Sequence, residues 1–242
     1  VNQPSLRWPI PADFSQRLLD ETCISVLRRA KYLLIETEHT QVLSHLGMSG
    51  SFRLVDPNTP LKTHDHVQIG VGELELRYHD PRRFGCLLWA DSDRAKQLID
   101  HLGPEPLSDA FNGEWLYEQS RRRTIAVKSF IMTNAVVVGV GNIYASESLF
   151  LSGIHPSRAA NRISKDRYRV LAEEIKKVLA SAIESGGTTL RDFVNGQGEP
   201  GYFQQTLSVY GREGERCHQC DALIQSRVIG GRNSCFCSRC QR

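Results

Sequence analysis

The chain has 242 residues, of which 40% are hydrophobic and 24% are charged, proportions that are ordinary for a globular protein. This length predicts one large domain or two smaller ones, each able to bury a core. No apolar run approaches the roughly 18 residues of a membrane span, and the opening VNQPSLRWPI lacks a signal-peptide pattern. The net charge is only +3, but residues 211–242 hold six arginines against three acids, and RRR occupies 121–123. Such runs are typical either of solvated surface or of surface that tracks phosphates.

The cysteines indicate a reducing compartment. There are seven, an odd number, and Cys23 and Cys86 lie in apolar stretches that predict reduced core thiols. In such a compartment, paired C-x-x-C motifs indicate a metal site and not disulfides.

The first hundred residues predict short strands, because their side chains alternate between apolar and polar or run β-branched. Gly72 marks a tight turn, and Pro57 and Pro60 punctuate a loop. Six or more strands without intervening helices favour a sandwich or a barrel. The predicted strand segments are ISVLRRAKYLLIET, TQVLSHLGMSGSFRLV, DHVQIGV and ELELRYH.

Residues 101–109, HLGPEPLSD, form a connection rich in glycine and proline that we expect to act as a hinge. Beyond it the spacing becomes helical in GEWLYEQSRRR, TIAVKSFIM, NIYASESLFLSG and residues 164–187. In the last of these, Ser164 is the predicted cap, and Gly186 and Gly187 end the helix. One face of that helix carries Leu171, Ile175, Val178, Leu179 and Ala182. We predict domains at residues 1–100, 110–210 and 211–242.

Two C-x-x-C pairs near the end of the chain have the spacing of a zinc ribbon. Four thiolates close a tetrahedral site, so the metal is expected to be structural and not catalytic. A segment this short cannot bury a core of its own, and metal binding must therefore stabilise its fold. Cys235 is expected to pack nearby without binding metal. The predicted ligands of one Zn²⁺ are Cys217, Cys220, Cys237 and Cys240.

The hairpin that this zinc would hold carries Arg232 in its turn, VIGGRNS. A stiff hairpin with an arginine at its tip suits a nucleic-acid groove. Upstream, GVGNIYASESLF places Asn142 where a helix N-cap is expected, and a helix N-terminus favours a phosphate. Most such turns are ordinary caps, but Lys128 and the run at 121–123 strengthen the phosphate interpretation.

Together, VVGVGNIYASESLF, SGIHP and the four-cysteine ribbon resemble the helix–two-turn–helix (H2TH) and zinc finger of formamidopyrimidine-DNA glycosylases. The motifs LRWPI, RRAKYLL, HLGMSGSFR, HDHV, RYHDPRRFG, HLGPEPLSD and EPGYFQQTLSVYGREGE extend the resemblance over essentially the whole chain. HLGPEPLS and DPRRFG favour this branch over the endonuclease VIII enzymes, which act mainly on oxidised pyrimidines. The resemblance implies an α+β multidomain fold with an N-terminal antiparallel β-sandwich, a helical H2TH domain and a zinc-ribbon hairpin with four cysteine ligands.

The resemblance also implies a function: a DNA repair enzyme that excises 8-oxoguanine and formamidopyrimidine from duplex DNA and cleaves the abasic site by β,δ-elimination. Enzymes that act on a base flip it out of the stack and fill the gap. The matching fillers are Met48, Arg82 and Phe84. The loop DFVNGQGEPGYF resembles the cover of the extruded purine.

Further roles follow from the same resemblance, motif by motif. Phosphate contacts match His64, Arg123, Asn142 and Arg232, with Arg122 as the alternative to Arg123. Lys31 matches a lysine implicated in proton transfer during strand cleavage, and Lys128 matches a lysine that lines the site. The predicted catalytic residues are therefore Lys31 and Arg232, and the predicted DNA contacts are His64, Arg82, Arg123, Asn142, Lys128, Met48 and Phe84.

One departure concerns the nucleophile, which in the family is an N-terminal proline followed by a glutamate. Here the sequence opens at Val1, and LRWPI aligns well inside the family pattern, so we expect roughly the first two dozen residues of that pattern to be absent. An α-amine titrates near pH 8, so a useful fraction is neutral and nucleophilic. Without this segment, which should supply a strand and a helix, we expect exposed apolar surface and DNA binding without the nucleophile.

Two alternatives remain open at this point: a non-catalytic zinc-ribbon protein that binds damaged DNA, and an endonuclease VIII-like glycosylase for oxidised pyrimidines. A purely structural zinc protein would leave the arginines and the filler motifs unexplained. We expect a cytoplasmic monomer, associated with the nucleoid when bound to damaged double-stranded DNA, and no membrane partner.

Overall fold

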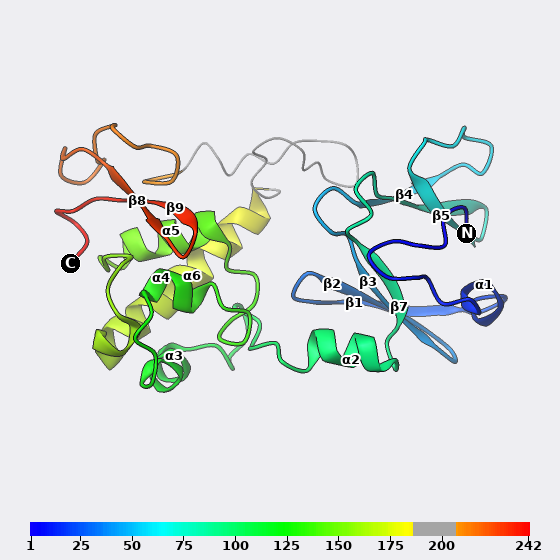
Figure 1. Ribbon diagram of the computed structural model, residues 1–242, viewed down its shortest axis with the longest axis horizontal. Helices are drawn as coiled ribbons and strands as arrows, with labels where there is room; N and C mark the ends of the chain where they lie inside the picture. The colour runs from blue at the N-terminus through cyan, green and yellow to red at the C-terminus, as the bar shows by residue number, and fades with distance from the viewer. Residues whose placement is uncertain (186–206) are drawn as a thin grey trace. The chain divides into compact units, whose positions relative to one another are not determined.

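The computed structural model describes residues 1–185 and 207–242. They form two compact units (Figure 1): the described residues of the first are 1–100, and those of the second are 101–185 and 207–242. Strands dominate the first unit, and helices with one zinc-ribbon hairpin make up the second, which confirms the predicted α+β class. In the described parts of the chain, no helix combines the length and hydropathy that crossing a membrane requires.

The first unit is a sandwich of two antiparallel sheets, as predicted. One sheet has the order β1-β2-β3-β7 and the other β4-β6-β5. Apolar side chains from both sheets, among them Val42 and Leu87 from one and Val67 and Tyr78 from the other, form one buried cluster. The strands are β1 (Cys23–Arg29), β2 (Tyr32–Thr37), β3 (Gln41–His45), β4 (Ser51–Val55), β5 (Asp65–Val71), β6 (Leu74–His79) and β7 (Cys86–Trp89).

The turns follow the sequence signals. Gly72 joins β5 to β6 with a φ of +59°, a left-handed conformation that glycine adopts without strain. The segment with Pro57 and Pro60 connects β4 to β5, and carbonyls of Pro57, Thr59 and Pro60 accept hydrogen bonds from the buried guanidinium of Arg77. The loop is therefore fixed by a buried cation.

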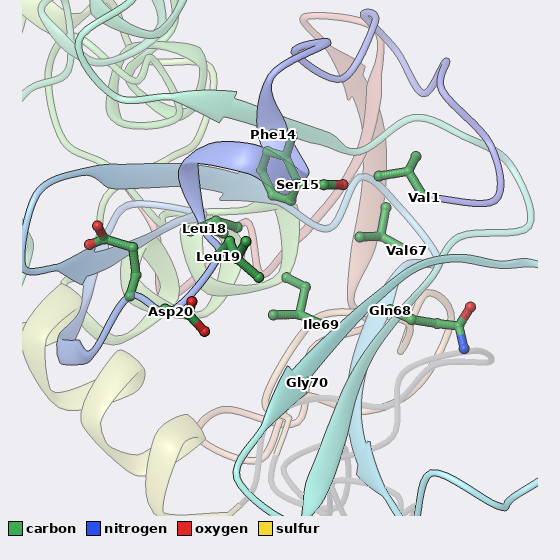
Figure 2. A pocket seen from close by; sticks show the side chains of 11 residues that line it. Val1, Phe14, Ser15, Leu18, Leu19, Asp20, Val67, Gln68, Ile69 and Gly70 are labelled. Carbon is green, nitrogen blue, oxygen red and sulfur yellow. The ribbon is translucent and has the colours of Figure 1, made fainter.

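Two short helices in this unit were not predicted. Helix α2 (Asp93–Ile99) has Ser92 as its N-cap, whose hydroxyl accepts a hydrogen bond from the amide of Ala95. Helix α1 (Phe14–Arg17) places the Phe14 ring on the Trp89 ring, with centroids 5.3 Å apart. A helix of four residues leaves no periodic pattern in the sequence, so α1 could not have been predicted from spacing. A cavity of about 380 Å³ lies between α1 and β5 (Figure 2).

The prediction that Cys23 is a core thiol was wrong, whereas Cys86 is buried as expected. Cys23 begins β1, the outermost strand of its sheet, where the apolar side chains of Ile24, Val26 and Leu27 are also more than half exposed. A second, apolar cavity of about 670 Å³ opens between the two sheets beside Val26. Apolar side chains of β1 are thus exposed at the edge of this sheet.

The second unit contains the four predicted helices, which surround one buried cluster. The longest helix has Ser164 as its N-cap, whose side chain accepts from the amide of Arg167. The predicted apolar face of this helix is buried: Leu171, Ile175, Val178, Leu179 and Ala182. Gly186 and Gly187, predicted to end the helix, lie outside the described residues. The predicted covering loop DFVNGQGEPGYF lies outside them too. The helices are α3 (Gly113–Ser120), α4 (Val127–Ile131), α5 (Asn142–Leu151) and α6 (Lys165–Glu184), with a 3-10 turn at Ala160–Arg162.

A buried carboxylate ties the chain that precedes the zinc hairpin to α5. The side chain of Glu147 accepts hydrogen bonds from three successive amides, those of Ser208, Val209 and Tyr210, at 2.7–3.0 Å. Glu147 is only 3% exposed. Because three charge-assisted bonds satisfy this carboxylate, its burial is compatible with a stable fold.

We expect Glu147→Ala to lower the free energy of unfolding by about 3 kcal/mol, since it leaves three amides without an acceptor. Urea denaturation followed by circular dichroism measures this change. The matched control is Glu173→Ala, which removes an exposed carboxylate from α6 and should change stability by less than about 0.5 kcal/mol. Equal stabilities of the two variants would contradict the anchoring role.

Candidate nucleic-acid interface and zinc centre

The four predicted zinc ligands converge at one point. Their Sγ atoms all lie within 4.8 Å of one another, at 3.9 Å for Cys217 and Cys240 and 3.4 Å for Cys220 and Cys237. Tetrahedral Zn²⁺ with Zn–S bonds of about 2.3 Å needs sulfur atoms about 3.8 Å apart. The donor set therefore fits one zinc in a closed site. Among the residues that the structure describes, this is the one cluster of histidine, cysteine and carboxylate side chains with such a geometry.

The C-x-x-C turn that carries the last two ligands, Cys237 and Cys240, is fixed to the helical domain. The Gln241 side chain accepts from the amide of Cys237 at 2.8 Å and donates to the carbonyl of Ile154 at 2.9 Å. Cys235 is buried in the same cluster as Cys217 and Cys237, as expected for a packing thiol. The zinc centre is thus continuous with the helical core.

The hairpin consists of β8 (Gln225–Ile229) and β9 (Arg232–Phe236), joined by Gly230 and Gly231. Both glycines have positive φ, +56° and +73°, which is the conformation of a tight two-residue hairpin turn. A Cβ on Gly230 would lie 2.6 Å from Ser129 Oγ, so glycine also permits the close approach to α4. Arg232 follows the turn and is exposed.

Two predicted site residues converge on the carbonyl next to Arg232. Asn142 Nδ2 donates to the carbonyl of Asn233 at 3.1 Å, and Lys128 Nζ donates to it at 3.3 Å and to Ser234 Oγ at 2.7 Å. The first turn of α5, helix α4 and the hairpin tip therefore meet at Asn233. This arrangement fixes the backbone that carries the tip arginine.

Lys128 is 1% exposed, so its ammonium acts within the protein. The pKa of Lys128 is lowered to about 8, mainly by burial; Cys235 opposes this shift, and Arg232 contributes to it. The influence of Arg232 indicates that the two cations are close. Lys128 thus holds the hairpin tip and adds positive charge behind it.

The prediction that Asn142 is an N-cap was wrong. The cap is Gly141, which has extended backbone, and Asn142 is the first residue of α5. Its side chain is consequently available to reach across to the hairpin, where its Oδ1 atom is buried without a hydrogen-bond partner. The helix N-terminus remains a place where backbone amides favour an anion.

The three arginines at 121–123 differ in their surroundings: one contacts the protein, and two are exposed. Arg121 stacks on the Tyr117 ring at 3.9 Å and donates to the carbonyls of Asn161 and Ile163. Its guanidinium is therefore used to close the helical domain. Arg122 and Arg123 are exposed, so either can meet a phosphate.

In the first unit, the three predicted filler residues lie on two loops. Met48 is 70% exposed in the loop between β3 and β4, and Phe84 is 46% exposed in the loop between β6 and β7. The Arg82 guanidinium lies 5.0 Å from the centroid of the Phe84 ring. Both apolar side chains are therefore accessible to a partner, as the predicted filling role requires.

His64 is half-buried, and its ring lies 6.0 Å from that of His66 and 5.9 Å from that of His79. Lys31 is exposed in the turn between β1 and β2, where Ala30 has a φ of +53°. The predicted strand segment ISVLRRAKYLLIET is therefore divided by this turn between two strands, β1 and β2.

His45 was missed by the sequence analysis. Burial lowers the pKa of His45, and the nearby charges of Lys31 and Arg7 lower it further, against the effect of Asp80. The histidine therefore lies in a cationic neighbourhood that includes a predicted catalytic residue. Its position at the start of HLGMSG, three residues before Met48, was the signal that could have revealed it.

The second unit thus combines a closed zinc hairpin with a helical domain, and the first unit exposes Met48, Arg82 and Phe84 on two loops of a β-sandwich. Family models match each part: the formamidopyrimidine-DNA glycosylase N-terminal domain at residues 1–87, its H2TH domain at 102–194, and the zinc finger found in FPG and IleRS at 214–242.

The whole chain is 57% identical to the formamidopyrimidine-DNA glycosylase of Alcanivorax borkumensis and 58% identical to that of Pseudomonas paraeruginosa, covering 90% of each. Among solved structures, the Lactococcus lactis Fpg complex with DNA that contains an abasic site matches with a TM-score of 0.83 at 33% identity. This match covers 95% of this chain and 86% of that one. A Lactococcus lactis Fpg complex with Fapy-dG DNA has a TM-score of 0.82, with the same identity and coverage. The chain belongs to the formamidopyrimidine-DNA glycosylase family.

We expect Cys237→Ala to lose zinc and, with it, the order of the hairpin, because the short segment depends on metal binding for its fold. Metal analysis of the purified protein should give one zinc per chain before the change and less afterwards. Cys235→Ala is the matched control: it removes a buried thiol two residues away and should retain the zinc. Equal zinc content in both variants would contradict the ligand assignment.

Proposed function

We propose that the function of this protein is that of the bifunctional DNA glycosylases and abasic-site lyases for oxidised purines, 8-oxoguanine and formamidopyrimidine, in duplex DNA. In this proposal the matched residues of the sequence supply the DNA grip and the wedges but not the attacking amine. The observation that carries this proposal is the match along the whole chain to relatives named formamidopyrimidine-DNA glycosylase, together with the fold shared with Fpg complexes with Fapy-dG and abasic-site DNA. Its place of work would be the cytoplasm, on the DNA of the nucleoid.

Each unit has its own part in this proposal. The second unit grips phosphates through Arg232, Asn142 and Arg123, with Lys128 acting from behind the hairpin tip. The exposure of Arg232 and Arg123 supports this assignment. A fixed arginine on a zinc-held hairpin positions a phosphate with little loss of conformational freedom.

The first unit supplies the wedges and the proton-transfer group. Met48 and Phe84 are apolar wedges that would fill the space of the extruded nucleotide, and Arg82 can pair with the orphaned base. Lys31 would transfer a proton during strand cleavage, and His64 would bind a phosphate. None of the matched residues is assigned as the nucleophile that attacks C1′ of the sugar.

We expect Arg232→Ala to weaken binding to a duplex with an abasic-site analogue and to flatten the salt dependence. Loss of one phosphate contact should lower the slope of log K against log salt concentration by about 0.9. Fluorescence anisotropy over a salt range of roughly 50 to 200 mM measures both quantities. An unchanged slope would contradict the phosphate role.

The matched control is Arg227→Ala, an exposed arginine on β8 of the same hairpin. It removes the same charge from the same module but not from the tip. If the slope of log K against log salt concentration falls equally in both variants, the decrease reflects the overall charge of the hairpin and not the position of Arg232.

Borohydride reduction on abasic-site DNA tests the assignment of the nucleophile. We expect the 242-residue chain to bind this DNA more tightly than undamaged duplex but to yield no covalent adduct, since no matched residue supplies the attacking amine. An adduct detected by gel electrophoresis would show that an amine of this chain acts, and peptide mapping would distinguish Val1 from Lys31. Equal affinity for damaged and undamaged duplex would instead contradict the proposed function.

A further inference from the structure

The two loops that carry the proposed wedges contact each other directly. Gly47, next to Met48, has a φ of +67°, and a Cβ there would lie 2.7 Å from both the amide nitrogen of Gly85 and the carbonyl carbon of Phe84. The amide of Gly47 also donates to Nδ1 of His45 at 2.8 Å. Any movement of one loop must therefore displace the other.

A buried carboxylate lies beneath this contact. Asp80 is fully buried, and its Oδ2 atom accepts from the amide of Gly85 at 2.8 Å. The backbone carbonyl of Asp80 accepts from the amide of Arg83 at 3.2 Å and pairs with His66 Nε2 at 2.8 Å. Asp80 thus binds the middle and the end of the loop 81–85 and connects it to β5.

A buried hydroxyl connects the same point to the other sheet. Tyr78 on β6 is fully buried, and its hydroxyl lies 3.1 Å from the carbonyl of His45 at the end of β3 and 3.4 Å from Asp80 Oδ2. A Cβ on Gly85 would lie 1.7 Å from that hydroxyl, so the packing leaves no space for a side chain there. Burial, followed by the charge of Asp80, raises the pKa of Tyr78, so the hydroxyl keeps its proton and remains a donor.

We propose that Asp80 and Tyr78 are positioning residues that hold the loops 46–50 and 81–85 as one preformed wedge, so that Met48, Arg82 and Phe84 enter the base stack together. This inference rests on the proposed function, because it assumes that these side chains fill the site of an extruded nucleotide. Asp80 and Tyr78 are buried and act only through the loops.

Preformed geometry has a clear physical benefit for such a wedge. Inserting side chains between stacked bases requires unstacking, which is unfavourable. If the loops also had to become ordered on binding, that cost would add to the unstacking cost. The arginine at position 83 has a φ of +54°, so the loop contains a conformation that needs support from its neighbours.

The test uses the zinc-loaded protein and a duplex with an abasic-site analogue, in which 2-aminopurine stands next to the orphaned base. This fluorescent adenine analogue brightens when it is unstacked, so it reports wedge insertion separately from affinity. Asp80→Ala removes the acceptor of the Gly85 amide, whereas Asp80→Asn retains one oxygen at the same place. We expect Asp80→Ala to lose about half or more of the fluorescence increase at saturating protein and Asp80→Asn to recover most of it.

Tyr78→Phe provides a second test that does not depend on the carboxylate. Its matched control is Thr37→Val, which removes a buried hydroxyl that donates to the carbonyl of Thr40 in the same unit, outside both wedge loops. We expect a reduced fluorescence increase for Tyr78→Phe and the wild-type increase for Thr37→Val, with thermal midpoints that fall by similar amounts. If Asp80→Ala does not fold, the pair Tyr78→Phe and Thr37→Val decides the question.

The outcomes separate this inference from the function on which it rests. Folded Asp80→Ala or Tyr78→Phe with the wild-type fluorescence increase would overturn the positioning role, while the wild-type protein still binds and unstacks the damaged duplex. If the wild-type protein neither prefers the damaged duplex nor changes the fluorescence, the proposed function fails and the inference falls with it.

Discussion

The coordination of one metal ion by four thiolates is the interaction on which the hairpin of the second unit depends. A hairpin of two five-residue strands buries too little apolar surface to fold alone. Once zinc fixes the two C-x-x-C turns, Gln241 connects the second of them to Ile154. At the hairpin tip, Lys128 and Asn142 both donate to the carbonyl of Asn233. The orientation of Arg232 follows from this chain of contacts, and the proposed phosphate grip follows from that orientation.

The first unit solves a related problem without metal. Its proposed wedges are large side chains exposed to water, which a loop alone would not hold in one place. Glycines at 47 and 85 allow the two loops to approach within the distance of a backbone contact, and a buried carboxylate and hydroxyl satisfy the groups at that contact. Both units therefore present exposed functional side chains from backbone that is fixed by buried polar groups.

Sequence alone predicted the features that depend on local spacing. The C-x-x-C pairs, the alternation of the strands and the cap at Ser164 are encoded within a few residues, so their structure was predictable. Features that depend on tertiary neighbours were not. Whether Cys23 is buried depends on what packs beside the edge strand β1, and whether Lys128 reaches solvent depends on a hairpin about a hundred residues later. The same reason explains why Arg121, within a run of three arginines, contacts carbonyls of the protein.

The buried ammonium of Lys128 has a consequence for the kinetics of DNA encounter. A buried cation still attracts nucleic acid over about 8 Å at physiological ionic strength, and low-dielectric surroundings screen that attraction less than water would. Lys128 and Arg232 together therefore form a small positive field at the hairpin tip, although only the arginine is exposed to a partner. Under the proposed function, Lys128 would influence how fast a duplex arrives, whereas the exposed Arg232 would determine how long it stays.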